Sequence, residues 1–427
     1  MSDLAEKFAV NCKSSMPGTA SRLVMARAND HVGVILHRVR SAHLASKNKK
    51  AKYWTARYLN SHDAHLWAAE EARQAMERHH CFPKTLVPTI ASGLDPWAGT
   101  PEEVRVNFIP KGSDPDHRRI IMDFGPKNRT LQYLVKGLLE TVAYRHPHQF
   151  GTGNGGPHAA IKHIAQAMKD GYLWAVEIDI EKCFPSFDAD KVADLLPLPK
   201  EVTERVVLSR HLNLVPGNLL DLFGGMSGGV HDGAPYGVPH TPHVGPAGGL
   251  GILGAEVLAE ARRGIPQGSA ASPIVCEMLL ALALNQLPNS GKVFAYIDNF
   301  LVMGKTKQDA VSMAQALGCA LKVHPAGPLR PKIKAVFHAG TPIEFLGHRL
   351  SVHHGTVVIE PSPLNREKFE VEMKTELAHI HSLSPGARAR KVCELKAYVR
   401  SWAAAFRLWP QAEIHKKQWL AKIADCS

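Results

Sequence analysis

The chain lacks the features of a secreted, disulfide-bonded or membrane protein. Its 427 residues contain seven scattered cysteines and no CxxC pair, which is not the pattern of a disulfide framework. No basic-then-apolar segment opens the sequence, and no apolar run approaches the roughly 20 residues that span a bilayer. We therefore expect a soluble, cytoplasmic protein in a reducing compartment, with no membrane partner.

Acidic residues are also few relative to basic ones. The chain has 51 Lys and Arg against 39 Asp and Glu, a net charge of +12. Such a balance favours partners that carry phosphate. Cations and aromatic rings interleave in one cluster: Lys47, Lys49, Lys50, Lys52, Tyr53, Trp54, Arg57 and Tyr58. Two interpretations of this cluster remain open, namely a surface that stacks bases and pairs phosphates, or a solvated helix start with a core-facing aromatic stripe.

The order of the expected elements indicates an α+β fold with helical ends. Residues 1–95 are expected to be mostly helical, with helices at 19–45 and 52–80, and 88–101 resembles a linker. Strands at 104–110 and 118–124 flank a polar turn. Further helices are expected at 128–144, 158–170, 270–287 and 307–320, and further strands at 173–180, 293–304, 333–337 and 343–360. Two or three amphipathic helices follow residue 364, and the Gly- and Pro-rich segment 215–255 is expected to be a long loop or insertion.

Two aspartates lie at the ends of apolar strands, Asp179 in AVEIDIEKCF and Asp298 in VFAYIDNFLV. Carboxylates among Val, Ile and Phe are costly to bury unless a positive charge lies beside them. Oxygen ligands suit Mg²⁺ or Mn²⁺. We expect a two-residue hairpin with Asp298 and Asn299 at its tip, because both residue types tolerate positive φ. This hairpin would bring Asp298 beside the strand that carries Asp179.

The segment RRGIPQGSAASP, 262–273, predicts an irregular loop that leads into a helix capped by Ser269 or Ser272. Its backbone and the Gln267 amide are suited to contact a nucleotide or a template base.

Taken together, these strings resemble reverse transcriptases of the bacterial group II intron, retron and defence-associated types. DIEKCF is similar to the first palm motif, GIPQGSAASP to the PQG-x-x-x-SP motif, YIDN to the YxDD box and IEFLGHRL to the primer grip. Upstream, KGSDPDHRRI resembles the fingers hairpin, and NRTLQYLV and HQFGTGNGGPHAAI resemble intron-type segments. The resemblance spans about residues 104–355. It implies a right-hand polymerase fold with an antiparallel palm sheet and a helical N-terminal extension.

The resemblance also implies roles for individual residues. Asp179 and Asp298, with the Ile180 carbonyl, would hold two Mg²⁺ ions, with Mn²⁺ as a substitute. The incoming triphosphate would be held by Lys111, Arg118 and Arg119, while Gln267 and Gly268 belong to the substrate-binding loop. Phe184 lies five positions after Asp179, where the family keeps an aromatic steric gate against the ribose 2′-hydroxyl, which would select deoxynucleotides; simple core packing is the alternative.

One position departs from the family. Asn299 stands where a second Asp is usual, which removes one negative charge from the catalytic set and leaves a weaker amide ligand. An active enzyme and a catalytically impaired palm both remain open.

The resemblance implies three parts: a helical extension (1–95), fingers and palm (96–360, with the insertion 215–255) and a helical thumb (361–427). The expected activity is RNA-directed DNA polymerisation from dNTPs on an RNA template, with a dedicated noncoding RNA expected and a DNA product. Bacterial antiphage defence is the role expected by analogy. The alternatives are untemplated or protein-primed DNA synthesis, and an impaired palm that serves as an RNA-binding or partner subunit. A homo-oligomer or a partner protein is left open.

Overall fold

The computed structural model describes residues 19–76, 81–111, 114–151, 153–217, 250–288 and 292–425. The chain divides into two compact units that interleave along the sequence. The first comprises the described residues up to Arg145, together with Glu181–Ala283 and Leu321–Arg330. The second comprises His146–Ile180, Leu284–Ala320 and the described residues from Pro331 onward. Most of the predicted insertion 215–255 lies outside the described residues.

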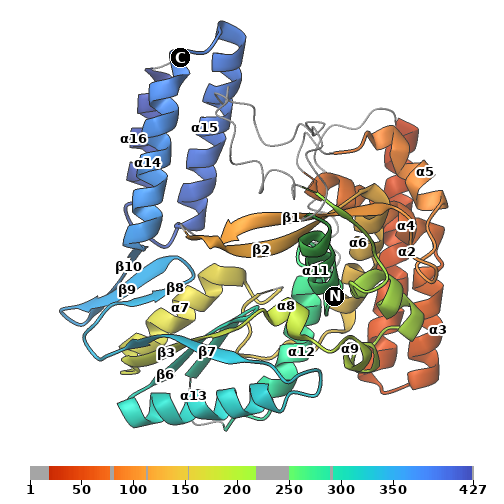
Figure 1. The fold of residues 1–427 in the computed structure, drawn as a ribbon, viewed down its shortest axis with the longest axis horizontal. Helices are drawn as coiled ribbons and strands as arrows, with labels where there is room; N and C mark the ends of the chain where they lie inside the picture. Colours follow the sequence, from red (N-terminus) through yellow and green to blue (C-terminus); the bar gives the residue numbers. More distant parts are fainter. Residues whose placement is uncertain are drawn as a thin grey trace. The chain divides into compact units, whose positions relative to one another are not determined.

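The N-terminal part of the first unit is helical. Its elements are α2 (Thr19–Leu44), α3 (Asn48–Leu59), α4 (His62–Ala75), the short 3-10 helix η1 (Lys84–Leu86) and α5 (Val87–Ser92) (Figure 1). The predicted helix 52–80 is therefore two helices. The helical conformation is interrupted at Asn60–Ser61, and the Ser61 side chain caps α4 by accepting a hydrogen bond from the Ala64 amide. The prediction of a linker at 88–101 was also wrong at its start, because α5 extends to Ser92. Pro88 lies in the first turn of this helix, where proline is well tolerated.

The sheet of the first unit has the strand order β2-β1-β4. Its strands are β1 (Glu103–Lys111), β2 (Asp114–Phe124) and β4 (Asn213–Pro216); β1 and β2 are antiparallel, whereas β4 runs parallel to β1. The predicted turn 111–117 was too long, since β2 already begins at Asp114.

The remaining helices of the first unit lie between and after these strands. They are α6 (Pro126–Val142), α8 (Cys183–Ser186), α9 (Ala189–Leu195), α10 (Lys200–Val202), the π-helical turn η2 (Thr203–Val207), α11 (Leu250–Ala261) and α12 (Ser272–Leu284). Residues 250–255 were expected to be loop but form the first half of α11. Their sequence LGILGA follows a Gly-rich stretch and is too short to show a helical pattern by itself, so the sequence alone did not distinguish helix from loop.

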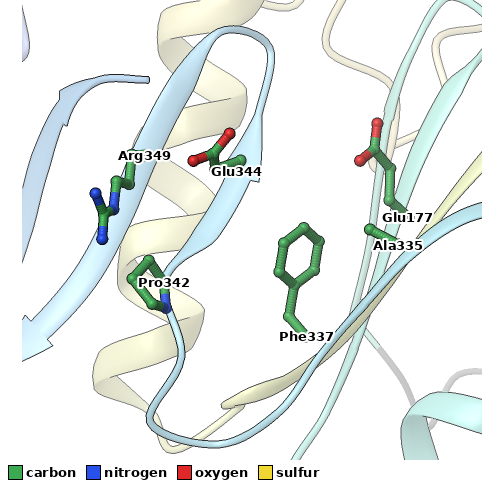
Figure 2. A pocket seen from close by; sticks show the side chains of 6 residues that line it. All are labelled: Glu177, Ala335, Phe337, Pro342, Glu344 and Arg349. Carbon is green, nitrogen blue, oxygen red and sulfur yellow. The ribbon is translucent and has the colours of Figure 1, made fainter. Parts of the chain in front are cut away.

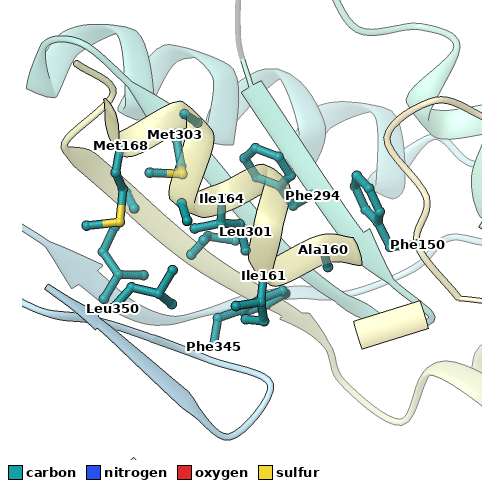
Figure 3. Close-up of a cluster of buried hydrophobic side chains, with 14 residues drawn as sticks. Phe150, Ala160, Ile161, Ile164, Met168, Phe294, Leu301, Met303, Phe345 and Leu350 are labelled. Carbon is teal, nitrogen blue, oxygen red and sulfur yellow. The ribbon is translucent and has the colours of Figure 1, made fainter. Parts of the chain in front are cut away.

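The second unit is built on a four-stranded antiparallel sheet of order β5-β6-β3-β7. Its strands are β3 (Trp174–Ile180), β5 (Lys292–Tyr296), β6 (Asn299–Gly304) and β7 (Pro331–Phe337), accompanied by α7 (Gly156–Lys169) and α13 (Lys307–Lys322). Apolar residues of α7 at helical spacing, such as Ile161 and Ile164, pack against Leu301 and Met303 of β6 (Figure 3). Ala175 of β3 belongs to the same buried cluster. This core fixes the sheet face on which the candidate residues lie.

A second antiparallel sheet and three helices complete this unit. The sheet, of order β10-β9-β8, consists of β8 (Ile343–Phe345), β9 (His348–His353) and β10 (Thr356–Pro361), so the expected strand pair at 343–360 is three strands. The helices are α14 (Pro363–Ile380), α15 (Pro385–Ala405) and α16 (Ala412–Ala424). They enclose an aromatic core that includes Phe369, Trp402 and Trp419.

The chain is therefore a mixed helical and sheet protein with small, mainly antiparallel sheets. None of the helices in the described ranges combines the length and the apolar character needed to cross a bilayer.

Candidate functional site

The two strands that carry the predicted acids are neighbours in the second unit. β3 and β6 pair antiparallel with Asp179 opposite Asn299, and Asp298 immediately precedes β6. Residues directly opposite each other on antiparallel strands point to the same face. Asp179 therefore shares a face with Asn299, and the same face holds Ala175 and Met303 in the core under α7. The prediction that the hairpin of Asp298 lies beside the strand of Asp179 is confirmed, whereas a shared metal site stays a prediction.

The hairpin that presents Asp298 differs from the expected one. Tyr296 pairs with Asn299, which leaves Ile297 and Asp298 as the two turn residues. The residue with positive φ is Ile297, at 55°, and not Asp298 or Asn299. A positive φ at the first turn residue is a feature of type II′ turns, where glycine is usual. A β-branched residue there stores strain of about 1–3 kcal/mol, and such residues cluster at active sites.

Asn299 connects the turn to a lysine that sequence reasoning missed. Its Nδ2 donates to Asp298 Oδ1 at 3.0 Å, and its Oδ1 accepts from Lys334 Nζ at 2.9 Å. Lys334 Nζ also lies 3.4 Å from Asp179 Oδ2 and 3.7 Å from Glu177 Oε1. The site thus contains a cation of the chain's own among these oxygens.

Glu177 is the other residue that sequence reasoning missed, although its spacing of two from Asp179 on one strand was a readable signal. Its side chain is only 18% exposed. Burial raises the pKa of the Glu177 carboxyl, and the ammonium of Lys334 acts in the opposite direction. Glu177 is therefore protonated more readily than an ordinary glutamate.

A cavity of about 410 Å³ adjoins Glu177 on the same face of the sheet (Figure 2). On one side lie Glu177, Ala335 and Phe337 of β3 and β7; the other side is formed from the β8–β9 hairpin and the residue before it. The lining residues from that side are Pro342, Glu344 and Arg349. The cavity therefore combines carboxylates, a guanidinium and an aromatic ring.

The donor set at the site is suited to a hard cation. The described residues hold no cluster of three or more His, Cys, Asp and Glu side chains placed to bind a metal. A divalent ion would therefore depend on the carboxylates of Asp179 and Asp298 together with neutral oxygens, namely the Ile180 carbonyl and the Asn299 amide. Such oxygen ligands fit Mg²⁺ or Mn²⁺ and not a softer metal. The Asp179 side chain is 16% exposed and already lies against an ammonium, so this position attracts a cation.

The predicted loop residues belong to the first unit. The Phe184 carbonyl accepts from the Ile265 amide at 3.1 Å, and the Met122 amide donates to the Gln267 carbonyl at 2.8 Å. The loop therefore joins the segment after β3 to strand β2. Gln267 Oε1 is buried without a hydrogen-bond partner in the part of the chain that the structure describes.

Glycine is required at two points of this loop. A Cβ on Gly264, whose φ is +58°, would lie 2.2 Å from the Phe184 carbonyl oxygen. A Cβ on Gly268, at φ +107°, would lie 2.2 Å from the Met122 carbonyl oxygen. Only a residue without a side chain permits these approaches. Of the two serines expected to cap α12, Ser269 accepts a hydrogen bond from the Ala271 amide at 3.3 Å just before the helix, whereas the Ser272 hydroxyl donates back to the Pro266 carbonyl at 2.7 Å.

The predicted phosphate-binding residues lie on the β1–β2 hairpin. Arg119 is exposed and pairs with Ile109, while Lys111 ends β1 and Arg118 is opposite Pro110. The side chains of Lys111 and Arg118 lie outside the described part of the structure. Arg119 is therefore the only one of these three predicted residues whose side chain is described, and the predicted grip on a triphosphate stays a prediction.

The basic and aromatic cluster at 47–58 lies partly in the core and partly at the surface. Tyr58 is a core residue whose hydroxyl donates to the Leu134 carbonyl at 3.0 Å. Trp54 is half-buried beneath the guanidinium of Arg38, 4.5 Å from the ring centroid. Tyr53 remains 56% exposed among exposed lysines. One ring of the three is thus open to solvent for stacking.

No protein-family model matches the sequence, and no curated protein matches it either. Among solved structures, the chain is similar to telomerase from Candida albicans in complex with a TWJ fragment of telomeric RNA. That likeness has a TM-score of 0.35 and 12% identity, and covers 80% of this chain and 58% of that chain. Apo telomerase from Candida tropicalis, truncated from its C-terminal domain, gives 0.33 and 10%, covering 62% and 56%. TM-scores below 0.5 carry no argument, so a functional assignment depends on the residues and their geometry.

Proposed function

We propose that this chain is a reverse transcriptase, an RNA-directed DNA polymerase with a right-hand fold that acts in bacterial antiphage defence. One observation carries the proposal: the strand that holds Asp179 pairs with the strand that Asp298 immediately precedes, although the two residues are 119 positions apart in the sequence. The order of the motifs around them supports it. The expected partners are an RNA template, dNTPs and the DNA product, and the defence role follows from family analogy alone.

In this proposal Asp179, Asp298 and the Ile180 carbonyl would hold two Mg²⁺ ions. Such ions supply activation of a primer hydroxyl and neutralisation of a triphosphate. Asn299 orients Asp298 through the hydrogen bond to its Oδ1. Arg119 is the described candidate for a phosphate contact, since a guanidinium binds phosphate in a bidentate way. The Phe184 ring would exclude a ribose 2′-hydroxyl.

Primer extension by the purified chain tests the proposal. The assay combines an RNA template, a DNA primer, dNTPs and Mg²⁺ or Mn²⁺, and compares the wild type with Asp298→Asn. Asp170→Asn serves as the matched control, because Asp170 is an exposed carboxylate of the same unit at the end of α7. We expect RNA-dependent product from the wild type and the control, and none from Asp298→Asn, which keeps the shape but loses the charge.

Other results would point elsewhere. Product of one or two nucleotides that survives RNase and needs no template would replace templated synthesis with untemplated or protein-primed synthesis. Asn299, which removes a catalytic charge, favours a second candidate, an impaired palm that serves as an RNA-binding or partner subunit. Unchanged function of Asp298→Asn in cells would establish that candidate and end the polymerase proposal.

A further inference from the structure

Lys334 reaches the candidate site through an irregularity of strand β7. Ala335 pairs with Glu177 and Ile333 pairs with Ile178, so Lys334 is an extra residue between two consecutive pairs. Such a β-bulge turns a side chain away from the direction that strict alternation would give it, and bulges are frequent beside active sites. The bulge lies next to Asp179 along the β3–β7 ladder.

The ammonium of Lys334 is surrounded by oxygens from two strands. Asn299 Oδ1 lies at 2.9 Å, Asp179 Oδ2 at 3.4 Å and Glu177 Oε1 at 3.7 Å. The lysine side chain is 37% exposed, so solvent screens these interactions in part. Two poorly exposed carboxylates near one another are unfavourable without a nearby cation, and this lysine provides it.

A divalent ion bound by Asp179 would share that carboxylate with the ammonium. Two cations a few ångströms apart repel each other, and the repulsion grows as water is excluded. We infer that Lys334 is a tethered counter-ion that neutralises the site before a metal binds and must leave Asp179 for the metal to enter. This inference rests on the metal site of the proposed function. Lys334 would then set the concentration of divalent metal at which the site becomes occupied.

The experiment measures Mn²⁺ affinity by the electron paramagnetic resonance of free Mn²⁺, without nucleotide or nucleic acid. Lys334→Met keeps the length of the side chain and removes its charge. We expect the Mn²⁺ dissociation constant to fall roughly fivefold, the range of a partly exposed ion pair. The melting temperature of the metal-free protein should also fall, because the carboxylates lose their counter-ion. Lys334→Arg keeps the charge and should bind Mn²⁺ like the wild type.

Lys332→Met is the matched control. Lys332 is exposed on the same strand and lies opposite Asp179 in the register, yet it forms no ion pair within the described ranges. Its removal changes the net charge equally, and we expect less than about a twofold effect on Mn²⁺ affinity. A fivefold gain in Lys334→Met alone would therefore come from the contact and not from the overall charge.

Three results would overturn the inference. Unchanged or weaker Mn²⁺ binding by Lys334→Met refutes displacement of the lysine. Equal gains in Lys334→Met and Lys332→Met assign the effect to positive charge along β7 and not to the contact that Lys334 makes. Unchanged binding by Asp179→Asn places the ion elsewhere and removes the premise. Because none of these measurements uses DNA synthesis, a chain that shows the fivefold gain but makes no product would contradict the proposed function and leave the counter-ion in place.

Discussion

The substitution Asn299→Asp restores the acid that the resembled family carries at this position. In the structure the Asn299 amide lies between Asp298 Oδ1, 3.0 Å away, and Lys334 Nζ, 2.9 Å away. The change therefore replaces a donated hydrogen bond with a repulsion toward Asp298, and adds an attraction toward any cation at the site. We expect the variant to bind divalent metal more tightly than the wild type.

The magnitude follows from the charges involved. One unit pair at 4 Å interacts with about 1 kcal/mol in water and about 4 kcal/mol at the effective dielectric of a protein surface. When a divalent ion is bound, the new carboxylate is attracted to two positive charges; when Lys334 occupies the site, it is attracted to one. The difference favours metal binding by the energy of about one such pair of unit charges. Asp298 and Asn299 are half-buried, and screening by water and salt favours the lower value. A gain of about 1–1.4 kcal/mol corresponds to a roughly fivefold to tenfold fall in the dissociation constant.

The assay is a Mn²⁺ titration followed by a Mg²⁺ titration of primer extension. Gln308→Glu is the control, since it adds the same charge at an exposed position on α13 in the same unit. The metal-free melting temperature of Asn299→Asp should fall, because the single charge of Lys334 must then offset one more carboxylate, which lies beside Asp298. Equal metal affinity in Asn299→Asp and the wild type would refute the reasoning that Asn299 limits the charge of this site.

Three further outcomes are expected. Phe184→Ala should admit ribonucleotides in primer extension if its ring is the sugar gate, and unchanged sugar discrimination would leave it a packing residue. Gly268→Ala should lower the free energy of unfolding by about 1–3 kcal/mol, because its Cβ would lie 2.2 Å from the Met122 carbonyl oxygen; Gly386→Ala, whose Cβ meets nothing within 4 Å, is the control in denaturant unfolding. Burial lowers the pKa of His415, with a further contribution from a nearby arginine, so protonation favours the unfolded chain. Stability of the C-terminal helices should therefore be complete above the ordinary histidine pKa and decline as pH falls through the lowered value. Tryptophan fluorescence during unfolding at about pH 7.5 and about pH 5.5 measures this, and an equal pH dependence in His415→Gln would contradict it.

The position of the candidate acids could be predicted from the sequence because short motifs place them at strand ends. Asp179 follows an apolar strand, and Asp298 lies between two short apolar strands, so alternation and turn chemistry predicted their meeting. The turn itself was predicted incorrectly. A β-branched residue with positive φ contradicts local preference, and only the pairing of Tyr296 with Asn299 imposes it on Ile297.

The amino-acid sequence by itself determined the strands that carry Asp179 and Asp298, the glycines of the 262–268 loop and the uncharged side chain at position 299. Only the tertiary structure decided which cation neutralises the acids. Lys334 is about 150 positions from Asp179, and its side chain reaches that carboxylate because one extra residue shifts the β3–β7 register. A bulge is a property of two paired strands, so neither strand's own sequence specifies it.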